Sequence, residues 1–219
     1  GANAAAYDAG TYSLNYEGVF TGVPNNGTVQ VPLRTLAKRF TLVGNPYASP
    51  INVLDFYDAN EDVLDPSAAI YFWRKRNNST VTSYATLTKD AYVWNNVPGG
   101  GIEWNEFFND TPETEWVINP GQGFYVKTRD GLTDPQLQFT NSMRRVNSHN
   151  DQFFRSGENG LKSRYWLDIT GNDNISQTAR VYSSTATLGI DYGRDANSRA
   201  TGALALYSVL DDHKLAVQA

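Results

Sequence analysis

The chain contains 219 residues, of which 40% are hydrophobic and 13% aromatic, and it carries a formal net charge of −5. A chain of this length can bury a sizeable core without metals or disulfides, and it corresponds to one large domain or two small ones. Its basic residues are outnumbered and dispersed, which argues against nucleic acid and acidic membrane surfaces as partners. Since the chain has no cysteine, disulfide scaffolds, thiolate catalysis and cysteine-ligated metal sites are excluded.

The two ends of the sequence indicate part of a longer protein. The opening residues lack the basic and strongly apolar regions of an intact signal peptide. At the other end, Leu215, Val217 and Ala219 alternate as in a strand. We expect this final strand to be a bare edge that could pair with another copy or with a following domain. No apolar run approaches the roughly 18 residues of a membrane-spanning helix, so we expect no direct membrane insertion.

Short stretches with apolar residues at every second position follow one another along the chain, whereas helical periodicity is scarce. Turn residues separate them, such as Asn26 and Gly27, a pair that suits a tight hairpin. The expected strands lie at residues 12–16, 29–33, 40–43, 70–73, 84–86, 92–94, 124–127, 137–140, 165–169, 180–182, 204–209 and 215–219. This pattern is typical of an antiparallel sandwich or barrel, and we expect an all-β fold, an antiparallel β-sandwich of jelly-roll type.

One segment has a different pattern and predicts a short helix near residues 50–58. Ser49 is a suitable N-cap, and Pro50 suits the first helical position. Ile51 and Leu54 then follow at helical spacing. We therefore expect one short helix in an otherwise all-β chain.

A turn-rich zone at residues 147–160 separates the last third of the chain from the rest. It is either a linker between two domains or a long loop within one. The last block has too few strands to bury both of its faces alone. We therefore expect a single module over residues 1–219, with a boundary near 147–160 as the alternative.

Residues suited to acid–base catalysis are few. His149 and His213 lie in polar, turn-like contexts where a histidine is most often solvated. No nucleophile elbow, zinc-protease helix or phosphate-binding loop motif occurs. A pair of carboxylates could hydrolyse a glycoside, and an aromatic-rich loop carries four acids, Glu103, Glu106, Glu113 and Glu115. Because acids are common in surface loops, we expect no enzymatic activity, with a glycosidase as the alternative.

One acidic segment is similar to the start of a calcium-binding loop, in which oxygens at positions one, three and five converge on the ion. Asp58, Asn60 and Asp62 occupy these positions. The match then fails, because Val63 replaces the glycine of the sharp turn and Ala69 replaces the bidentate glutamate. The three residues are calcium candidates, but a solvated loop is favoured, and we expect no metal and no cofactor.

Aromatic residues are abundant, with 5 Trp, 13 Tyr and 10 Phe. Most lie at alternating strand positions, where packing explains them. Exposed rings on a sandwich can also stack on sugars, so a carbohydrate-binding module with a glycan partner is the alternative function. Trp73 and Trp94 are the candidate rings, because each adjoins a polar residue.

Four motifs occur in order along the chain: LVGNPYA at 42–48, IYFWRK at 70–75, INPGQGFYVKT at 118–128 and LQFTNSMR at 137–144. Together they resemble the region near the C-terminus of many large surface and secreted proteins of the Bacteroidota, just upstream of a type IX secretion sorting domain. The resemblance implies a non-catalytic structural or spacer module of a secreted or outer-surface protein, for example an adhesin or a filament component. Its partners would be other domains of the parent chain, including a C-terminal sorting domain that is missing here, and further copies bound through an edge strand.

The motif residues also have an architectural explanation of their own. Gly44 lets the chain turn after a strand, and Asn45 is held extended by the proline that follows it. The amide of Gln122 can bridge backbone groups where the chain enters the next strand. The structural candidates are Gly44, Asn45, Pro46, Tyr47, Pro120, Gly121, Gln122 and Gly123.

Overall fold

The computed structural model describes residues 19, 21–74, 83–93, 113–145, 163–171, 174–200 and 204–219. Within them the strands are β1 (Val29–Pro32), β2 (Phe40–Gly44), β3 (Ile51–Asn52), β4 (Ile70–Arg74), β5 (Ser83–Leu87), β6 (Tyr92–Val93), β7 (Val117–Ile118), β8 (Gly123–Lys127), β9 (Gln136–Phe139), β10 (Arg164–Gly171), β11 (Asn174–Val181), β12 (Ala196–Asn197), β13 (Ser208–Leu210) and β14 (His213–Gln218). The helices are α2 (Val53–Ala59) and the 3-10 turns η1 (Glu113–Glu115) and η2 (Asn141–Met143). The strand expected at 12–16 and the turn-rich zone at 147–160 lie outside the described residues.

A five-stranded antiparallel sheet, the central sheet, has the order β2-β8-β4-β5-β6. Across it, Leu42 and Tyr71 both lie opposite Tyr125, and Trp73 lies opposite Tyr84. Because side chains alternate between the two faces of a strand, these residues share one face and their chain neighbours share the other. The central sheet is therefore apolar on both faces and needs a covering layer on each.

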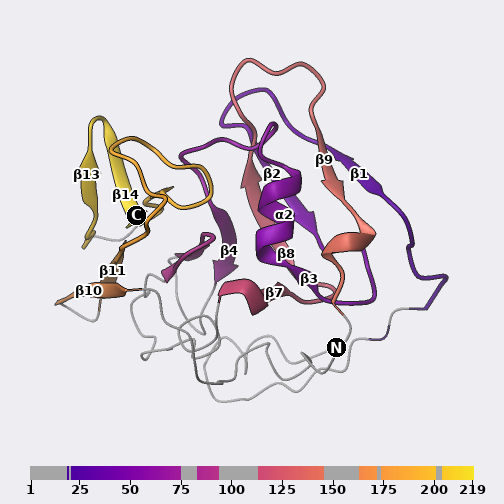
Figure 1. The fold of residues 1–219 in the computed structure, drawn as a ribbon, viewed down its shortest axis with the longest axis horizontal. Coiled ribbons are helices and arrows are strands. Elements are labelled where there is room, and N and C mark those ends of the chain that lie inside the picture. Colours follow the sequence, from indigo (N-terminus) through magenta and orange to yellow (C-terminus); the bar gives the residue numbers. More distant parts are fainter. Residues whose placement is uncertain are drawn as a thin grey trace, which may run out of the picture.

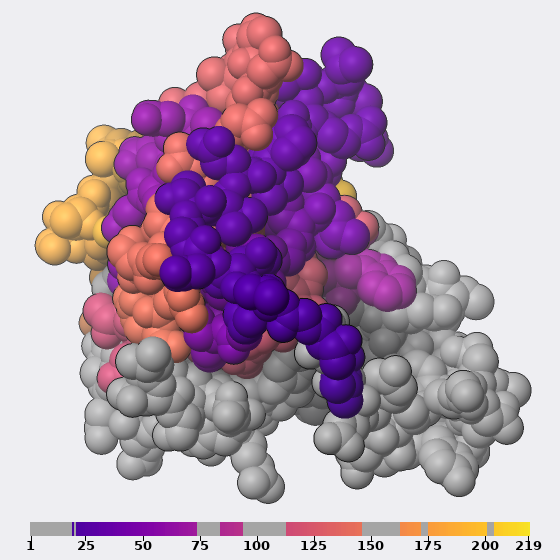
Figure 2. All heavy atoms as spheres, turned by 90° about the vertical axis from the view of Figure 1, so that its right-hand side faces the viewer, coloured from indigo at the N-terminus to yellow at the C-terminus, as the bar shows by residue number. Residues whose placement is uncertain are grey.

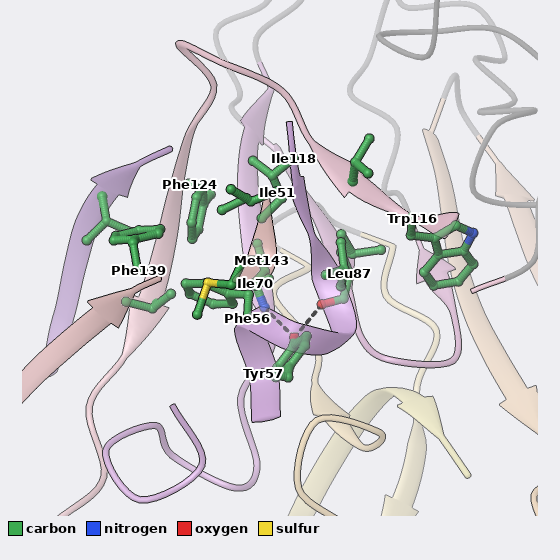
Figure 3. Close-up of a cluster of buried hydrophobic side chains, with 14 of the residues drawn as sticks. Ile51, Phe56, Tyr57, Ile70, Leu87, Trp116, Ile118, Phe124, Phe139 and Met143 are labelled. Atoms are coloured by element: carbon green, nitrogen blue, oxygen red, sulfur yellow. Dashed lines mark hydrogen bonds between the residues drawn. The ribbon is translucent and has the colours of Figure 1, made fainter. Parts of the chain in front are cut away.

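The first layer consists of α2 with the β1–β9 and β3–β7 pairs (Figure 1). The β1–β9 pair lies on the side of the molecule that faces the viewer in Figure 2. Under this layer, Phe56 of α2 packs edge-on against Phe124, with ring centroids 5.4 Å apart. The Tyr57 hydroxyl donates to the Leu87 carbonyl at 2.6 Å and accepts from the Ile70 N–H at 2.9 Å (Figure 3). One tyrosine thus connects the helix to two strands of the central sheet.

The second layer is a sheet with the order β10-β11-β14-β12, in which β13 also pairs with β14 (Figure 1). Its pairs in the described residues are antiparallel except β11–β14, which is parallel. The small residues Ala179, Ala216 and Val217 form a second core with Tyr71 and Val93 of the central sheet. The expected all-β sandwich fold is confirmed.

Hydrogen bonds also join the first block of the chain to the last. The Asn197 N–H donates to the Ser67 carbonyl at 2.9 Å. The Trp166 indole N–H donates to the Tyr92 carbonyl at 3.0 Å. The two blocks therefore share backbone contacts as well as a core.

The helix begins later than the sequence predicts, so Ser49 as its N-cap was wrong. Asn52 is the N-cap, and its side chain accepts a hydrogen bond from the Asp55 N–H at 3.1 Å. Ile51 is instead fully buried in β3, opposite Ile118. Residues 51 and 52 form a strand instead of the first turn of the helix, because in β3 the side chain of Ile51 is buried opposite Ile118. None of the helices in the described residues has the length and apolar character to cross a membrane.

The expectation that the final strand is a bare edge was also wrong. β14 pairs with β11 on one side and with β12 and β13 on the other. Leu215, Ala216 and Val217 are fully buried in succession, so both faces of β14 are covered, as in an interior strand. One edge of this sheet is β10, which pairs only with β11 in the part of the chain that the structure describes, and β12 and β13 lie at the other edge.

Candidate functional site

Asn45 and Tyr47 hold the segment after β2 in place through hydrogen bonds. The Asn45 amide donates to the carbonyls of Ser49 and Ile118 at 2.8 and 3.0 Å, and its oxygen accepts from the Tyr47 N–H at 3.0 Å. Tyr47 is buried, and its hydroxyl donates to the Gly27 carbonyl at 2.6 Å. Both side chains therefore bond to the backbone of their own chain.

The segment before β8 is a tight turn. Gly121 has a φ of +73°, in the left-handed region that favours glycine. The Gln122 side-chain oxygen accepts from the Asn119 N–H at 3.2 Å, and the Gln122 carbonyl accepts from the Asn45 N–H at 3.4 Å. The turn and the segment after β2 are thus bonded to each other.

The remaining motif residues lie at the same end of the central sheet. Gly44 and Gly123 are paired across β2 and β8. Pro46 and Pro120 line a cavity of about 470 Å³ between the two segments. The structure brings all the structural candidates together at this junction.

The calcium candidates have other contacts. Asn60 is buried, and its amide donates to the Gln138 carbonyl at 3.0 Å while its oxygen accepts from the N–H of the same residue at 2.8 Å. Asp58 pairs with the Lys89 ammonium at 2.6 Å, and Asp62 is exposed. Among the described residues, no group of three or more His, Cys, Asp or Glu side chains is placed to hold a metal ion.

Of the other candidates, Trp94, Glu103, Glu106 and His149 lie outside the described residues. Glu113 is buried and forms an ion pair with Arg164, whereas Glu115 is exposed. His213 begins β14, with its Nδ1 3.1 Å from the Asn197 side-chain oxygen. Glu113 and Arg164 therefore act as a buried structural pair within the sandwich.

The second sheet covers only part of the central-sheet face on which it packs, and the uncovered part carries exposed apolar and aromatic side chains. Trp73 is 54% exposed, and Leu42 on the same face is 60% exposed. Tyr84, opposite Trp73, packs edge-on against Tyr125, with ring centroids 6.0 Å apart. Trp73 is therefore a ring that a ligand can reach, at the border of a cluster of tyrosines.

Beside this surface lies a cavity of about 410 Å³, the basic pocket. Its walls carry four aromatic rings, those of Phe40, Tyr71, Tyr84 and Tyr125. They also carry four basic side chains, those of Arg34, Lys38, Arg39 and Arg199. Rings and cations line the same site, a combination suited to an anion with an apolar face.

One of these basic residues belongs to a charge network around the buried Asp65. Arg39 lies 3.5 Å from Asp65 and 3.2 Å from Asp130, and Lys127 lies 2.8 Å from Asp65. Burial by itself would raise the pKa of Asp65, but hydrogen bonds from Lys127 and Ser67 outweigh burial and hold this pKa below its usual value. Asp65 therefore remains ionised and balances the charge of Arg39 and Lys127.

These features define an all-β sandwich module with an aromatic face and a basic pocket. At one end of its central sheet, hydrogen bonds join the segment after β2 to the segment before β8. The chain belongs to the family described as a domain of unknown function (DUF8693), whose model matches residues 3–219. No curated protein matches the chain, and no solved structure does.

Sequence reasoning missed the basic pocket. Arg34, Lys38 and Arg39 are close together in the sequence and were the one local signal for it. Arg199 follows β12, far along the chain, and only the packing of the two sheets brings it beside Phe40. A dispersed set of basic residues thus converges at one site.

Proposed function

We propose that this chain is a non-catalytic structural module of a secreted or cell-surface bacterial protein exported by type IX secretion, in an adhesin or a filament. The cellular setting rests on the resemblance of the four motifs to surface proteins of the Bacteroidota. The structural role is supported by the motif side chains. Asn45, Tyr47 and Gln122 all bond to the backbone of the chain itself.

The observation that carries an assembly role is the edge strand β10. Its eight residues pair only with β11 in the described part of the chain. Tyr165, Leu167 and Ile169 share one face of β10 and are 42%, 48% and 39% exposed. A long apolar edge strand is a template for pairing with another chain. The module therefore associates with further copies of itself through β10.

Sedimentation of the chain over a range of concentrations tests this role. We expect the wild type to form dimers or larger species as its concentration rises. Leu167→Lys should keep the chain monomeric, because it places a charge on the apolar face of the edge. Leu188→Lys is the matched control, since Leu188 lies between β11 and β12, outside any strand, and is 97% exposed, and it should behave as wild type. A wild type that is monomeric at every concentration would contradict the assembly role.

The second candidate is saccharide binding, and the exposed ring of Trp73 favours it. Trp73 shares a sheet face with Tyr84, its neighbour across β4 and β5, and with Leu42 of β2, so apolar side chains lie on the same face. Such a surface can stack on the apolar face of a sugar ring. If this candidate holds, Trp73→Ala removes the binding of oligosaccharides to the chain.

A further inference from the structure

We propose that the basic pocket binds the carboxylate-bearing ring of an acidic saccharide, a uronate residue within a polysaccharide, and that Trp73 stacks on an adjoining sugar. The inference rests on the second candidate function, saccharide binding, and specifies its ligand. It follows from the charge of the pocket, the setting of Arg199, the backbone of the pocket rim and the size of the cavity.

The charge of the pocket is unusual for this chain, whose formal net charge is −5. Of the four basic residues in the walls, Arg39 is balanced by Asp65 and Asp130. Arg34, Lys38 and Arg199 form no ion pair with any of the described residues. Like charges around one cavity repel each other, and a bound anion relieves this repulsion. The pocket therefore favours a negatively charged ligand.

Arg199 is placed to hold a carboxylate. Its guanidinium carbon lies 4.7 Å from the centre of the Phe40 ring, 5.8 Å from that of Tyr71 and 5.6 Å from that of Tyr84. These contacts orient the planar guanidinium group, while its N–H donors form no hydrogen bond within the described part of the chain. A guanidinium held on rings with free donors is suited to two parallel hydrogen bonds with a carboxylate.

The loop at the rim of the basic pocket has an energetically unfavourable backbone conformation at two residues. Ala37 and Arg39 have φ values of 58° and 57°, in the left-handed region that residues with a side chain rarely adopt. The loop is held by the Arg34 N–H, which donates to the Thr41 hydroxyl at 3.0 Å, and by the Arg39 carbonyl, which accepts from the Thr128 N–H at 2.9 Å. Strained backbone persists where the surrounding structure holds it, and it concentrates at ligand sites.

The size of the pocket and the position of Trp73 favour a saccharide over a small free anion. A cavity of about 410 Å³ is large enough for a sugar ring, which fills it better than a bare inorganic ion would. Trp73 lies opposite Tyr84, a wall residue, but is itself outside the pocket. A polysaccharide can fill both positions at once, with a carboxylate in the pocket and the apolar face of the next sugar on the tryptophan.

Calorimetric titration with oligogalacturonate of defined length, and with a neutral galactose oligomer of the same length, tests the proposal. We expect the wild type to bind the acidic oligomer far more tightly than the neutral one, and less tightly as salt is added. Arg199→Ala should weaken binding about tenfold to hundredfold, since it removes hydrogen bonds to a charged group. Arg34→Ala repeats the test at an exposed pocket residue, whose replacement disturbs the fold less than that of Arg199, which packs on three rings. Lys214→Ala should change affinity by less than about twofold, because the exposed Lys214 ammonium lies over the Tyr207 ring and is not part of the pocket wall.

The outcomes separate this proposal from the function on which it rests. Equal binding of both oligomers that is lost in Trp73→Ala retains saccharide binding and overturns the uronate site. Binding of oligogalacturonate that neither Arg199→Ala nor Arg34→Ala weakens also overturns it. Binding that is lost in Arg199→Ala but unchanged in Trp73→Ala overturns the stacking role of Trp73. No binding of either oligomer overturns both the ligand and the second candidate function.

Discussion

Asp65 lies where the loop that forms the pocket rim meets the central sheet, and its charge sets a pH dependence of stability. Hydrogen bonds from Lys127 and Ser67 outweigh the effect of burial and hold the pKa of Asp65 below its usual value. The unfolded chain has no such hydrogen bonds, so its Asp65 has the higher pKa. The ionised carboxylate therefore stabilises the fold above about pH 4, and this stabilisation is lost as the pH falls through the pKa of the folded state.

We expect Asp65→Asn to lower the free energy of unfolding by about 1–3 kcal/mol at neutral pH. The difference from wild type should shrink as the pH falls below about 4 and through the lower pKa of folded Asp65, because protonation then leaves a neutral group at this position in both chains. Denaturant unfolding at a series of pH values measures it. Asp130→Asn is the matched control, because Asp130 also pairs with Arg39 but is 89% exposed, and the expected change is below about 0.5 kcal/mol. An Asp65→Asn difference that is independent of pH would contradict the charge network.

At the scale of elements, α2 is joined to the central sheet by one buried hydroxyl. Tyr57 is fully covered, and burial raises its pKa well above the usual value, so the hydroxyl keeps its proton and donates to Leu87. It also accepts from the Ile70 N–H. Both backbone groups lie in the interior and depend on this side chain.

Tyr57→Phe should therefore lower the free energy of unfolding by about 1–3 kcal/mol, because it leaves a buried N–H and a buried carbonyl without their partner. Thermal or denaturant unfolding measures the change. Tyr182→Phe removes a hydroxyl from a residue that is 67% exposed, and it should change the free energy by less than about 0.5 kcal/mol. Equal effects of the two substitutions would mean that the hydroxyl of Tyr57 does not join helix and sheet.

The helix also shows what a sequence can predict at this scale. Its existence follows from the local pattern, and the structure confirms it. Its start does not, because Ser49 and Asn52 are both good N-cap residues. The choice between them depends on Ile51, which pairs with Ile118 from a distant part of the chain. Long-range pairing of this kind leaves no signal in a short window of sequence.

For the whole molecule, the period of two along the chain was sufficient to predict the sandwich, but not its sheet order or the basic pocket. The final strand alternates like an edge strand, yet its neighbours β11, β12 and β13 cover it on both sides. The pocket depends on Arg199 from the last block meeting Phe40 from the first. Alternation indicates which face of a strand is apolar, whereas the partner that covers this face depends on contacts distant in the sequence.

Buried ion pairs connect the first block of the chain to the last. Glu113 pairs with Arg164, and both side chains are almost fully covered, while the buried Asp90 pairs with Arg194. Separating the two blocks would leave these charges without partners, which is costly in the interior of a protein. We therefore expect the two blocks to unfold together.

Native-state hydrogen exchange, resolved by mass spectrometry, tests this central claim most directly. We expect the amides of β8 in the central sheet and of β14 in the second sheet to exchange with the same free energy, that of global unfolding. If β14 exchanges with a clearly lower free energy than β8, the last block opens by itself, and the description of the chain as a single rigid module is wrong.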